Sequence, residues 1–370
     1  MDYQASLTRS QVRTPALLLD LDALEANISA MATRARVLGV ALRPHAKSHK
    51  CIEIARRLCT AGAVGASCAT PAEAEVLAAG GIPGILITSP MLTADALARI
   101  RRLLVRGGDL MLVVDHPDQV GQLAGMAIQV ERRLPVLVDF DVGHGRTGCL
   151  EVSDALAVAK RIAQCSSLRF VGVQAYWGNL QHIASFEERK HRVEPQAQRL
   201  AHLIAALTEE GLRPEIVTGG GTGTHWIDGQ TGLFTELQPG SFLFLDSGYA
   251  AIELSPEPEP NPFRSSLFVA AAVVSANRSN RVIINAGFKA FATDSGRPVP
   301  LRGAPADATY RFMGDEHGAI EFTTGPGPAL GSIIELLTSR SDTTANLYAQ
   351  YHVVRGGAII DEWVIAARGY

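Results

Sequence analysis

The chain has 370 residues and a mass of 39.4 kDa. At roughly 150 residues per domain, this length predicts two domains, or one barrel of about 250 residues with a smaller partner. Hydrophobic residues make up 47% of the chain and charged residues 19%, which argues against intrinsic disorder and against a fibrous repeat. A formal charge of -3 without a long basic run argues against a nucleic-acid-binding protein.

The sequence contains no signal for membranes or export. No apolar stretch approaches the roughly 18 residues that a membrane span needs, and the start, MDYQASLTRSQVRTP, lacks the cationic-then-apolar pattern of a secretory signal. The five cysteines are odd in number and form no C-x-x-C pair, which argues against a disulfide framework and a thiolate zinc site. We therefore expect a cytoplasmic protein whose cysteines are small buried hydrophobic residues.

Strand and helix signals alternate from about residue 16 to residue 250. Helical patterns lie between most of the extended apolar runs, which we expect to be eight strands. These runs begin at Val40, Ala63, Gly84, Leu110, Leu134, Leu168, Pro214 and Ser241. Eight such units predict an α/β fold built on a TIM (β/α)8 barrel.

Several predicted helices have recognisable starts. Thr70-Pro71-Ala72-Glu73 is typical of a capping box, in which the threonine oxygen accepts from the Glu73 amide and the glutamate reaches back. Thr93 and Ser153 are expected to be further N-caps, and residues 186–211 a long amphipathic helix. The helix before the first strand has an apolar face made of Leu21, Leu24, Ile28 and Met31.

After Tyr249 the pattern changes to a second, mostly β domain. The stretch ELSPEPEPNPF is a proline-rich linker, and short strands with glycine turns follow it. The final stretch, YAQYHVVRGGAIIDEWVIAA, predicts a hairpin over Arg355-Gly356-Gly357. The other expected strands lie in LFVAAAVVSA, RVIINAG, YRFMGDEHGAIEF and SIIELLT. We expect residues 13–250 to form the barrel domain and residues 251–370 the β domain, with residues 1–12 packing against the latter.

We expect the residues just beyond each strand to include the functional ones, because chemistry in a TIM barrel takes place at the carboxyl ends of the strands. RPHAKSHK, residues 43–50, places Lys47 immediately after the first strand in a segment rich in cations. Neighbouring positive charge and partial burial lower the pKa of a lysine toward neutrality, as Schiff-base formation requires. Lys47 is therefore a candidate nucleophile, and a basic surface turn is the alternative.

A glycine-rich run, VTGGGTGTHW, follows the seventh predicted strand. Residues 218–223 offer backbone amides without bulky side chains, an arrangement suited to a phosphate. Gly240 and Ser241 are expected at the neighbouring eighth position, and a phosphate site after strands 7 and 8 recurs in this barrel. No G-K-[ST] follows, so the run is not a Walker loop.

A lysine at strand 1 and a phosphate cradle at strands 7 and 8 favour pyridoxal 5'-phosphate, which needs one amine and one anion site. The sequence also resembles the D-threonine aldolase and D-serine dehydratase family, relatives of alanine racemase that share fold type III, a barrel followed by a β domain. The resemblance covers essentially the whole chain in order. It rests on TPALLLDLDALEANI, RPHAKSHK, CATPAEAEVLAAGG, VDFDVGHGRTG, VQAYWGNLQHI, VTGGGTGT, ELQPGSFLFLD, INAGFKAFATDSG, DEHG and NLYAQYHVVRGG.

The resemblance implies roles for individual residues. Lys47 would form the internal aldimine, and Arg146 would contact the cofactor, at its phenolic oxygen. His182 is implied as an acid or base, since imidazole titrates near neutrality. The other implied cofactor ligands are Tyr176, Thr218, Gly220, Gly221, Thr222, Gly240 and Ser241. The residues expected near the substrate are Gln181, Tyr249, His317 and Asp342.

One part of the family pattern is missing. The family holds a divalent metal through a histidine followed two residues later by aspartate in the aldolases or cysteine in the dehydratases. Here Asp342 is retained, but Arg340 stands at the histidine position. Because a guanidinium stays protonated and has no lone pair to donate, we predict little or no tightly bound divalent metal. Arg340 would then substitute for the ion, select an acidic substrate, or pair with Asp342.

The resemblance implies a pyridoxal-phosphate-dependent lyase acting on a β-hydroxy D-amino acid, by retro-aldol cleavage to glycine and an aldehyde. The alternatives are elimination of the hydroxyl from D-serine or 3-hydroxyaspartate, racemisation, which needs no metal, and a non-catalytic cofactor carrier. The resemblance also implies a homodimer in which the β domain of each subunit approaches the barrel mouth of the other. Residues near Asp294 and His317 would complete the partner's site.

Overall fold

The computed structural model describes residues 8–90, 93–256 and 261–369, and these form two compact units. The first, which we call the β unit, contains residues 8–29, 241–251 and 262–368. The second, the barrel unit, contains the described residues between 30 and 240, with a short return at 252–256. This division differs from the predicted domain boundaries at residues 13 and 250, because the first strand of the chain pairs within the β unit. Part of the predicted linker, residues 257–260, lies outside the described residues.

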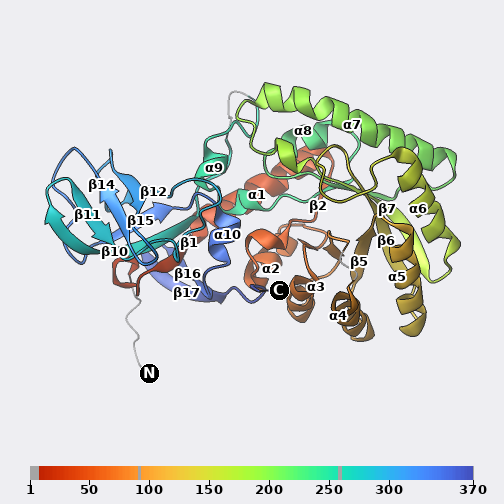
Figure 1. The fold of residues 1–370 in the computed structure, drawn as a ribbon, viewed down its shortest axis with the longest axis horizontal. Helices are drawn as coiled ribbons and strands as arrows, with labels where there is room; N and C mark the ends of the chain where they lie inside the picture. Colours follow the sequence, from red (N-terminus) through yellow and green to blue (C-terminus); the bar gives the residue numbers. More distant parts are fainter. Residues whose placement is uncertain (1–7, 91–92, 257–260, 370) are drawn as a thin grey trace. The chain divides into compact units, whose positions relative to one another are not determined.

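Eight parallel strands form the sheet of the barrel unit (Figure 1), in the order β2-β9-β8-β7-β6-β5-β4-β3. A parallel bridge between His45 and Ser67 joins the two edge strands, and the N–H of Val64 donates to the carbonyl of Leu42 at 2.8 Å. The sheet therefore closes on itself, and the predicted TIM barrel is confirmed. The strands are β2 (Ala41–Leu42), β3 (Ser67–Cys68), β4 (Ile85–Ile87), β5 (Leu110–Val114), β6 (Leu134–Phe140), β7 (Leu168–Ala175), β8 (Ile216–Gly219) and β9 (Glu236–Leu237).

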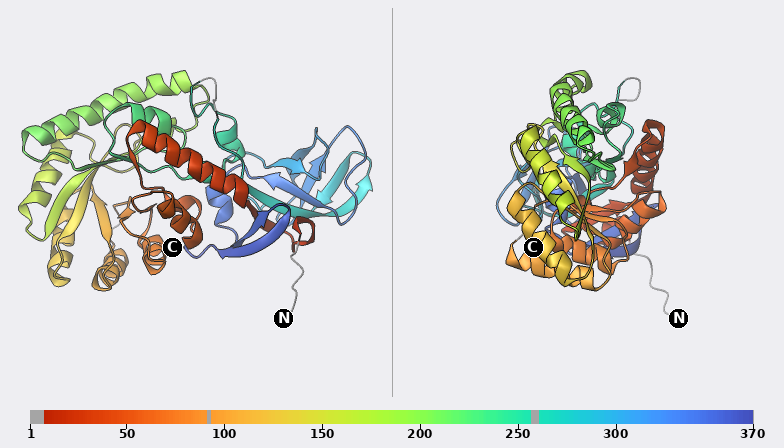
Figure 2. Two further views of the ribbon diagram at one scale, coloured as in Figure 1. Left: turned by 180° about the vertical axis from the view of Figure 1, so that it is seen from behind. Right: turned by 90° about the vertical axis from the view of Figure 1, so that its right-hand side faces the viewer.

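Helices follow the barrel strands and lie outside them (Figure 2). A buried apolar cluster joins neighbouring barrel strands; it contains Leu86, Met111, Val113, Leu137 and Val171. None of the helices in the described part of the chain has the length and apolar character of a membrane span. The helices are α1 (Leu21–Leu38), which precedes β2, then α2 (Ile52–Thr60), α3 (Pro71–Ala79), α4 (Ala94–Val105), α5 (Pro117–Gln129), α6 (Val152–Gln164), α7 (Phe186–Glu209) and α8 (His225–Gln230).

Of the two hydrogen bonds predicted for the capping box of α3, the one accepted by Thr70 is confirmed. The hydroxyl of Thr70 accepts the N–H of Glu73 at 3.2 Å, and a proline occupies the first turn. The Glu73 carboxylate reaches back to the N–H of Ala69, at 2.6 Å, rather than to Thr70. Its second oxygen lies 3.0 Å from Nζ of Lys50, so Glu73 links the start of α3 to the segment after β2.

Two other local predictions were wrong. Helix α6 begins at Val152 with Glu151 at the N-cap, so Ser153 is not the cap, whereas Thr93 caps α4 as predicted. The eighth barrel strand is β9, and the apolar run that begins at Ser241 instead forms the 3-10 turn η4 (Ser241–Leu243). Its side chains are buried on all sides, and a short, fully buried run does not distinguish a strand from another buried segment.

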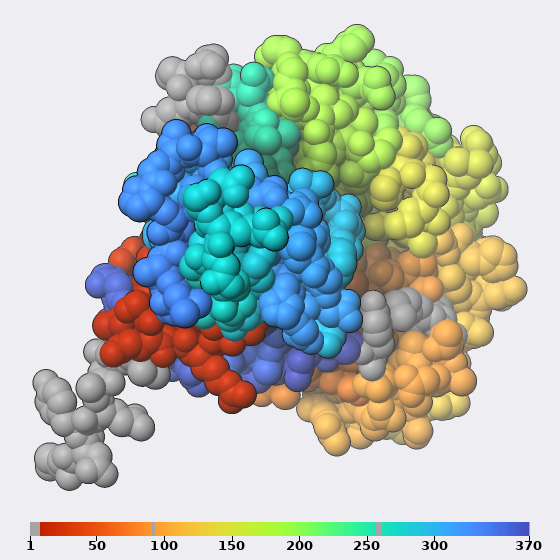
Figure 3. Space-filling view, turned by 60° about the vertical axis from the view of Figure 1, so that its left-hand side comes forward, coloured from red at the N-terminus to blue at the C-terminus, as the bar shows by residue number. Residues whose placement is uncertain are grey.

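The β unit is built on a mixed sheet with the order β13-β14-β11-β10-β1-β16-β17, to which β15 and β12 are added beside β10. Strand β1 (Ala16–Asp20) pairs antiparallel with β10 and parallel with β16. Figure 3 shows the cyan and blue segments of this unit beside the red N-terminal segment. The other elements are α9 (Ser247–Ala250), β10 (Leu267–Arg278), β11 (Arg281–Ile284), β12 (Val299–Arg302), β13 (Thr309–Phe312), β14 (Gly318–Glu321), β15 (Ile333–Leu337), α10 (Ser341–Ala345), β16 (Gln350–Arg355) and β17 (Ala358–Val364).

The strand predictions for this unit are largely confirmed. The hairpin β16–β17 turns at Gly356 and Gly357, both with positive φ. The stretch YRFMGDEHGAIEF, expected as one strand, is a second hairpin formed by β13 and β14. Strand β12 was not predicted, because three of its four side chains are exposed and it has no apolar alternation.

Candidate active site

Lys47 lies in a short 3-10 turn, η2 (Ala46–Ser48), beyond the carboxyl end of β2. Its Nζ is 5.9 Å from the centroid of the Tyr176 ring, which follows β7. The guanidinium of Arg146, on the loop after β6, lies 5.5 Å from the same centroid. Barrel closure thus brings together three residues predicted from separate stretches. Two cations beside one aromatic ring make this end of the barrel attractive to an anionic group.

The other long cations of residues 43–50 are used to hold the barrel together. Arg43 is buried and forms a bidentate pair with Glu236, with Nε and Nη2 each 2.7 Å from a carboxylate oxygen. Lys50 forms the ion pair with buried Glu73 described above. The segment has no carboxylate of its own, but the fold supplies one to each of these two residues. Arg43 and Lys50 are therefore engaged in structural ion pairs.

The loop after β6 carries a histidine, His144, that the sequence-based expectations did not include. Its ring packs edge-on against Tyr176, with 5.8 Å between the centroids. Burial, followed by the charges of Arg146 and Lys47, lowers the pKa of His144. His182, the predicted acid or base, lies between α7 and the 3-10 turn η3 (Gly178–Leu180), and its side chain is exposed. The position of His144 on the loop directly after a barrel strand was the signal that could have identified it.

The same loop has its shape set by Asp141. Its carboxylate accepts the backbone N–H groups of Gly143, His144 and Gly145, at 2.8, 2.7 and 3.0 Å. Although burial opposes ionisation, these donors hold the pKa of Asp141 below its ordinary value. An aspartate that binds the next amides in this way forms a tight turn, and here the turn presents Arg146.

A buried carboxylate lies behind the glycine-rich loop that follows β8. Asp228 is fully buried, and the backbone of Gly221 hydrogen-bonds to it. The indole Nε1 of Trp177 donates to it at 2.7 Å, and the hydroxyl of Thr224 donates at 2.6 Å. Burial outweighs these donors and raises the pKa of Asp228 to about 7. The Gly221 amide, predicted to bind phosphate, is therefore engaged with Asp228.

Gln181, predicted to lie near the substrate, is buried and supports this loop from the opposite side. Its Oε1 accepts the N–H of Gly223 at 2.9 Å, and its Nε2 donates to the hydroxyl of Thr224 at 2.9 Å. The ring of His225 adds a further contact, since its Nδ1 lies 2.8 Å from the carbonyl of Thr222. The loop is therefore a rigid scaffold rather than a free glycine run.

The loop nevertheless fits a phosphate group. An added Cβ would crowd the Asp228 carboxylate at Gly220 and would lie 2.9 Å from the Ser48 hydroxyl at Gly240, so both positions favour glycine. Gly220 also has a φ of 72°. A side-chain-free backbone at this end of the barrel, together with the amine of Lys47, fits pyridoxal 5'-phosphate. The amides of Gly221 and Gly223 are engaged within the protein, which leaves the backbone around Gly220, Thr222 and Gly240 as the candidate phosphate site.

Thr218, another predicted cofactor ligand, belongs to a polar network inside the barrel. Its hydroxyl accepts from Nε2 of Gln238 at 2.8 Å. Nearby, Gln174 donates to Asp139 at 2.9 Å, and all four residues are buried. Burial raises the pKa of Asp139 to about 6, against the hydrogen bonds from Gln174 and Thr147. The network fills the barrel centre with paired polar groups.

The remaining predicted residues lie in the β unit. Ser241 donates its hydroxyl to Asp342 at 3.2 Å, and Tyr249 is buried in α9. Arg340 occupies the N-cap position of α10, with Nη1 3.5 Å from the hydroxyl of Ser295. His317 is exposed, in the turn between β13 and β14.

The residues around Arg340 do not fit the family's metal. Within the described ranges, no three or more histidine, cysteine, aspartate or glutamate side chains gather closely enough to hold an ion. Burial raises the pKa of the Asp246 carboxyl, and the negative charge of Asp342 raises it further. Asp246 itself accepts both the N–H and the hydroxyl of Ser341 at 2.9 Å. Arg340, at the N-cap position of α10, is a guanidinium and supplies no lone pair for a metal.

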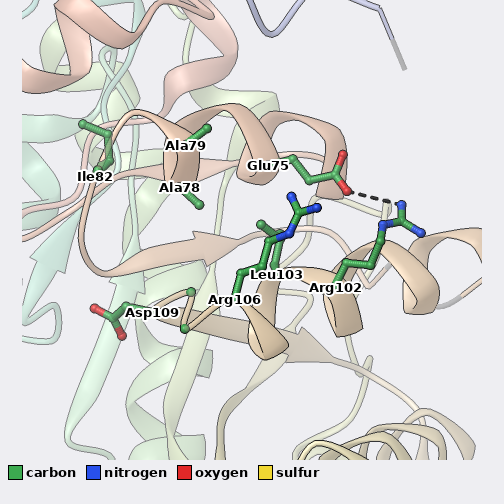
Figure 4. Close-up of a pocket in the computed structure, with 11 residues that line it drawn as sticks. Glu75, Ala78, Ala79, Ile82, Arg102, Leu103, Arg106 and Asp109 are labelled. Atoms are coloured by element: carbon green, nitrogen blue, oxygen red, sulfur yellow. Dashed lines mark hydrogen bonds and ion pairs between the residues drawn. The ribbon is translucent and has the colours of Figure 1, made fainter.

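A separate cavity of about 640 Å³ lies at the other end of the barrel (Figure 4). It is lined by residues that precede β4 and β5, among them Ile82 and Asp109, and by Arg106. At its rim Arg102 pairs with Glu75 at 3.4 Å. Because TIM barrels place their chemistry at the carboxyl ends of the strands, this cavity is not the candidate active site.

A closed barrel with a lysine after its first strand and a glycine loop near its last strands, followed by a β unit, defines an alanine racemase-like protein. Residues 19–248 match the family model described as "Alanine racemase, N-terminal domain", and residues 266–354 match "Putative serine dehydratase domain". The chain therefore belongs to the fold type III pyridoxal phosphate family.

Full-length relatives support this assignment. The chain is 38% identical to a D-threonine aldolase of Arthrobacter sp. and 33% identical to a 3-hydroxy-D-aspartate aldolase of Paracoccus denitrificans. Each alignment covers 98% of this chain and 94% of the relative. The crystal structure of D-threonine aldolase from Filomicrobium marinum superimposes with a TM-score of 0.92 at 37% identity, covering 98% of this chain and 97% of the other.

Proposed function

We propose that this protein is a pyridoxal-phosphate-dependent lyase that cleaves β-hydroxy D-amino acids to glycine and an aldehyde. The observation that carries the proposal is the group formed by Lys47, Tyr176 and Arg146 at the carboxyl ends of three barrel strands. The two aldolase relatives, which align over nearly the whole chain, support the reaction type.

The chain's own residues would hold the cofactor at two points, its aldehyde and its phosphate. Lys47 provides the amine, and the backbone around Gly220, Thr222 and Gly240 receives the phosphate. Arg146 holds negative charge on the ring, with Tyr176 packed beside it. When bound, pyridoxal phosphate supplies the electron sink for bond cleavage at Cα.

Cleavage between Cα and Cβ requires removal of the proton from the β-hydroxyl group. We assign this proton transfer to His182, the acid or base that the family resemblance implies, whose side chain is exposed. His144 lies against Tyr176 and, with its lowered pKa, is a neutral acceptor at neutral pH. It is the second candidate for moving a proton at this end of the barrel.

Arg340 would select the substrate. The guanidinium replaces the family's metal ligand, and a guanidinium binds a carboxylate in bidentate fashion. We therefore propose a preference for an acidic substrate such as a 3-hydroxyaspartate over D-threonine.

Product analysis tests the reaction. The purified protein with pyridoxal phosphate is incubated with D-threonine and with D-3-hydroxyaspartate, and glycine, aldehyde, keto acid and ammonia are measured. Aldol cleavage gives glycine with acetaldehyde or glyoxylate. Elimination, which the match of residues 266–354 to a serine dehydratase model also favours, gives 2-oxobutyrate or oxaloacetate with ammonia and no glycine. Exchange of the Cα hydrogen for deuterium with inversion, without cleavage, would assign racemisation instead.

We further propose a cytoplasmic homodimer. All five cysteines are free thiols, as expected in a reducing compartment. Symmetric dimers are the commonest oligomers, and the family resemblance implies one in which each β unit completes the partner's site. Light scattering of the active enzyme tests the assembly, and an active monomer would exclude shared sites.

A further inference from the structure

The turn that carries Lys47 is held by backbone hydrogen bonds at its exit and by a side chain at its start. Within η2 and its exit, the N–H groups of His49 and Lys50 both donate to the carbonyl of Ala46, at 3.1 and 2.7 Å. The N–H of Lys47 is bound by a side chain instead, since it donates to Nδ1 of His45 at 3.2 Å. His45 therefore caps the turn that presents the lysine.

The second nitrogen of the same ring connects the turn to a neighbouring strand. Nε2 of His45 lies 3.1 Å from the hydroxyl of Thr88, directly after β4. The Thr88 hydroxyl also donates to the carbonyl of Cys68, the last residue of β3, at 3.1 Å. The ring thus spans from the end of β2 to the ends of β3 and β4.

These contacts determine where the hydrogens lie. Because Nδ1 accepts the Lys47 N–H, it carries no proton, and the ring proton resides on Nε2. Nε2–H then donates to the Thr88 oxygen, and the Thr88 hydroxyl donates to the Cys68 carbonyl. Each donor in this series of three hydrogen bonds has an acceptor. The neutral His45 ring, with its proton on Nε2, therefore satisfies all three hydrogen bonds.

The surroundings favour the same state. His45 is buried, and the charged groups that face it are Lys47, Arg146 and Lys50, with His49 also nearby. Burial is the largest influence, and these positive neighbours add to it, so the pKa of His45 falls well below its ordinary value. A second proton would also place an N–H on Nδ1 against the N–H of Lys47, which would break the cap.

We propose that His45 is a positioning residue for Lys47: its imidazole fastens the lysine turn to the end of β4 through Thr88 and so sets where the amine enters the barrel mouth. This role rests on the proposed function, in which the Lys47 amine binds pyridoxal phosphate. It places His45 outside the reacting atoms, since it acts only through the backbone of Lys47.

The test measures how fast the apoprotein captures pyridoxal phosphate. Apoprotein is mixed with the cofactor, samples are quenched with borohydride at intervals, and the labelled lysine is located by peptide mass spectrometry. Four variants are compared. His45→Leu removes both ring contacts, and His45→Asn keeps an acceptor for the Lys47 N–H. Thr88→Val removes the Nε2 partner, together with the Thr88–Cys68 hydrogen bond, and leaves the Nδ1 cap in place. His116→Leu is the control.

His116 is a matched control because it caps α5 in the same way, with Nδ1 3.2 Å from the N–H of Asp118, but its side chain is largely exposed. His116→Leu should lower the melting temperature and leave the labelling rate at Lys47 unchanged. His45→Leu should slow labelling by roughly tenfold or more, because a small displacement of a reacting group has a large effect on rate. Thr88→Val should slow it by about fivefold, the effect of one hydrogen bond, and His45→Asn should lie between wild type and His45→Leu.

The outcomes separate this proposal from the one on which it rests. Wild-type label on Lys50, or on no lysine, would overturn the proposed function. Label on Lys47 at the wild-type rate in a folded His45→Leu protein would overturn the positioning role alone. If His45→Leu does not fold, the Thr88→Val protein decides, and an unchanged labelling rate in that folded variant would again overturn it.

Discussion

At the scale of single residues, the groups in contact with each cation of residues 43–50 indicate whether its role is structural or chemical. Arg43, Lys47 and Lys50 lie within eight residues of one another, yet Arg43 and Lys50 each meet a buried carboxylate. Lys47 meets the Tyr176 ring and, beyond it, a second cation. Arg43 and Lys50 are thus engaged in structural ion pairs, whereas Lys47 lies near the aromatic ring that also packs beside Arg146.

Lys47→Ala and Lys50→Met should therefore behave differently. Lys47→Ala should abolish the visible absorbance of the cofactor-loaded protein and all turnover. Lys50→Met should keep the borohydride-stable label on Lys47 but lose stability, by about 3–5 kcal/mol, because Glu73 is left buried without its cation. Absorbance spectra, labelling and thermal unfolding of both variants distinguish the roles. A label that disappears in Lys50→Met but persists in Lys47→Ala would reverse the assignment.

Arg340 provides the second residue-scale prediction. Wild-type activity should persist in a strong chelator, and elemental analysis should find less than stoichiometric divalent metal. Arg340→His should bind Mn²⁺ with Asp342 and should lose preference for 3-hydroxyaspartate over D-threonine by roughly tenfold, the loss of one charge-assisted contact. Activity that collapses in chelator and returns with metal would show that other residues complete a metal site.

At the scale of the element, the glycine loop after β8 depends on the side chains behind it. Gly221 and Gly223 are bound by Asp228 and Gln181, and an added Cβ at Gly223 would lie 2.0 Å from the backbone oxygen of Gln181. A backbone oxygen cannot move aside as a flexible side chain can. The loop and the segment around Gln181 therefore form one packed unit.

Gly223→Ala should displace this loop. We expect a loss of stability of about 1–3 kcal/mol from overpacking and at least a tenfold weaker affinity for pyridoxal phosphate in a spectroscopic titration. Gly121→Ala is the control, because it lies within α5 with no atom near the added Cβ. It should leave cofactor affinity unchanged and raise stability by up to about 1 kcal/mol. Wild-type cofactor affinity in Gly223→Ala would contradict the proposed phosphate loop.

At the scale of the whole molecule, several buried titratable groups make stability depend on pH. Burial lowers the pKa of His49 and of His225 to about 3 each, so their contribution is present above pH 6.5 and is lost as the pH falls toward 3. Asp228 has the opposite sign, because burial raises its pKa to about 7. The folded state keeps a proton on Asp228 over a range in which the unfolded chain has released it.

Asp228→Asn should reveal this contribution. Between pH 4 and pH 7, wild-type stability falls relative to the variant by at most about 1.4 kcal/mol per pH unit, and above pH 7 the difference is constant. The histidine contributions are common to both proteins and cancel. Thermal unfolding of both proteins across this range measures the difference. A flat difference for Asp228→Asn would show that its pKa is not raised.

Much of the fold was predictable because it is encoded locally. Apolar periodicity identified most barrel strands, Thr70 and Thr93 identified helix starts, and the glycine pair at residues 356–357 identified a hairpin. The motif resemblance correctly indicated the family. The prediction failed where a short buried run carried no period, so the strand expected at Ser241 is in fact β9, a few residues earlier.

The sequence by itself determined the residues available for chemistry: a lysine after the first barrel strand, a glycine loop after the seventh, and an arginine in place of a histidine at residue 340. Only the tertiary structure decided how they are used. Glu236 and Glu73 reach the lysine segment from distant strands and helices, and His45 meets Thr88 only because the barrel closes. Strand β1 likewise belongs to the β unit because it pairs with β10 and β16. Both partners lie hundreds of residues away in the chain, so no local pattern reveals the pairing. Local patterns record periods and caps, whereas the partner that a charge, a ring nitrogen or a strand edge meets is set by closure of the sheets.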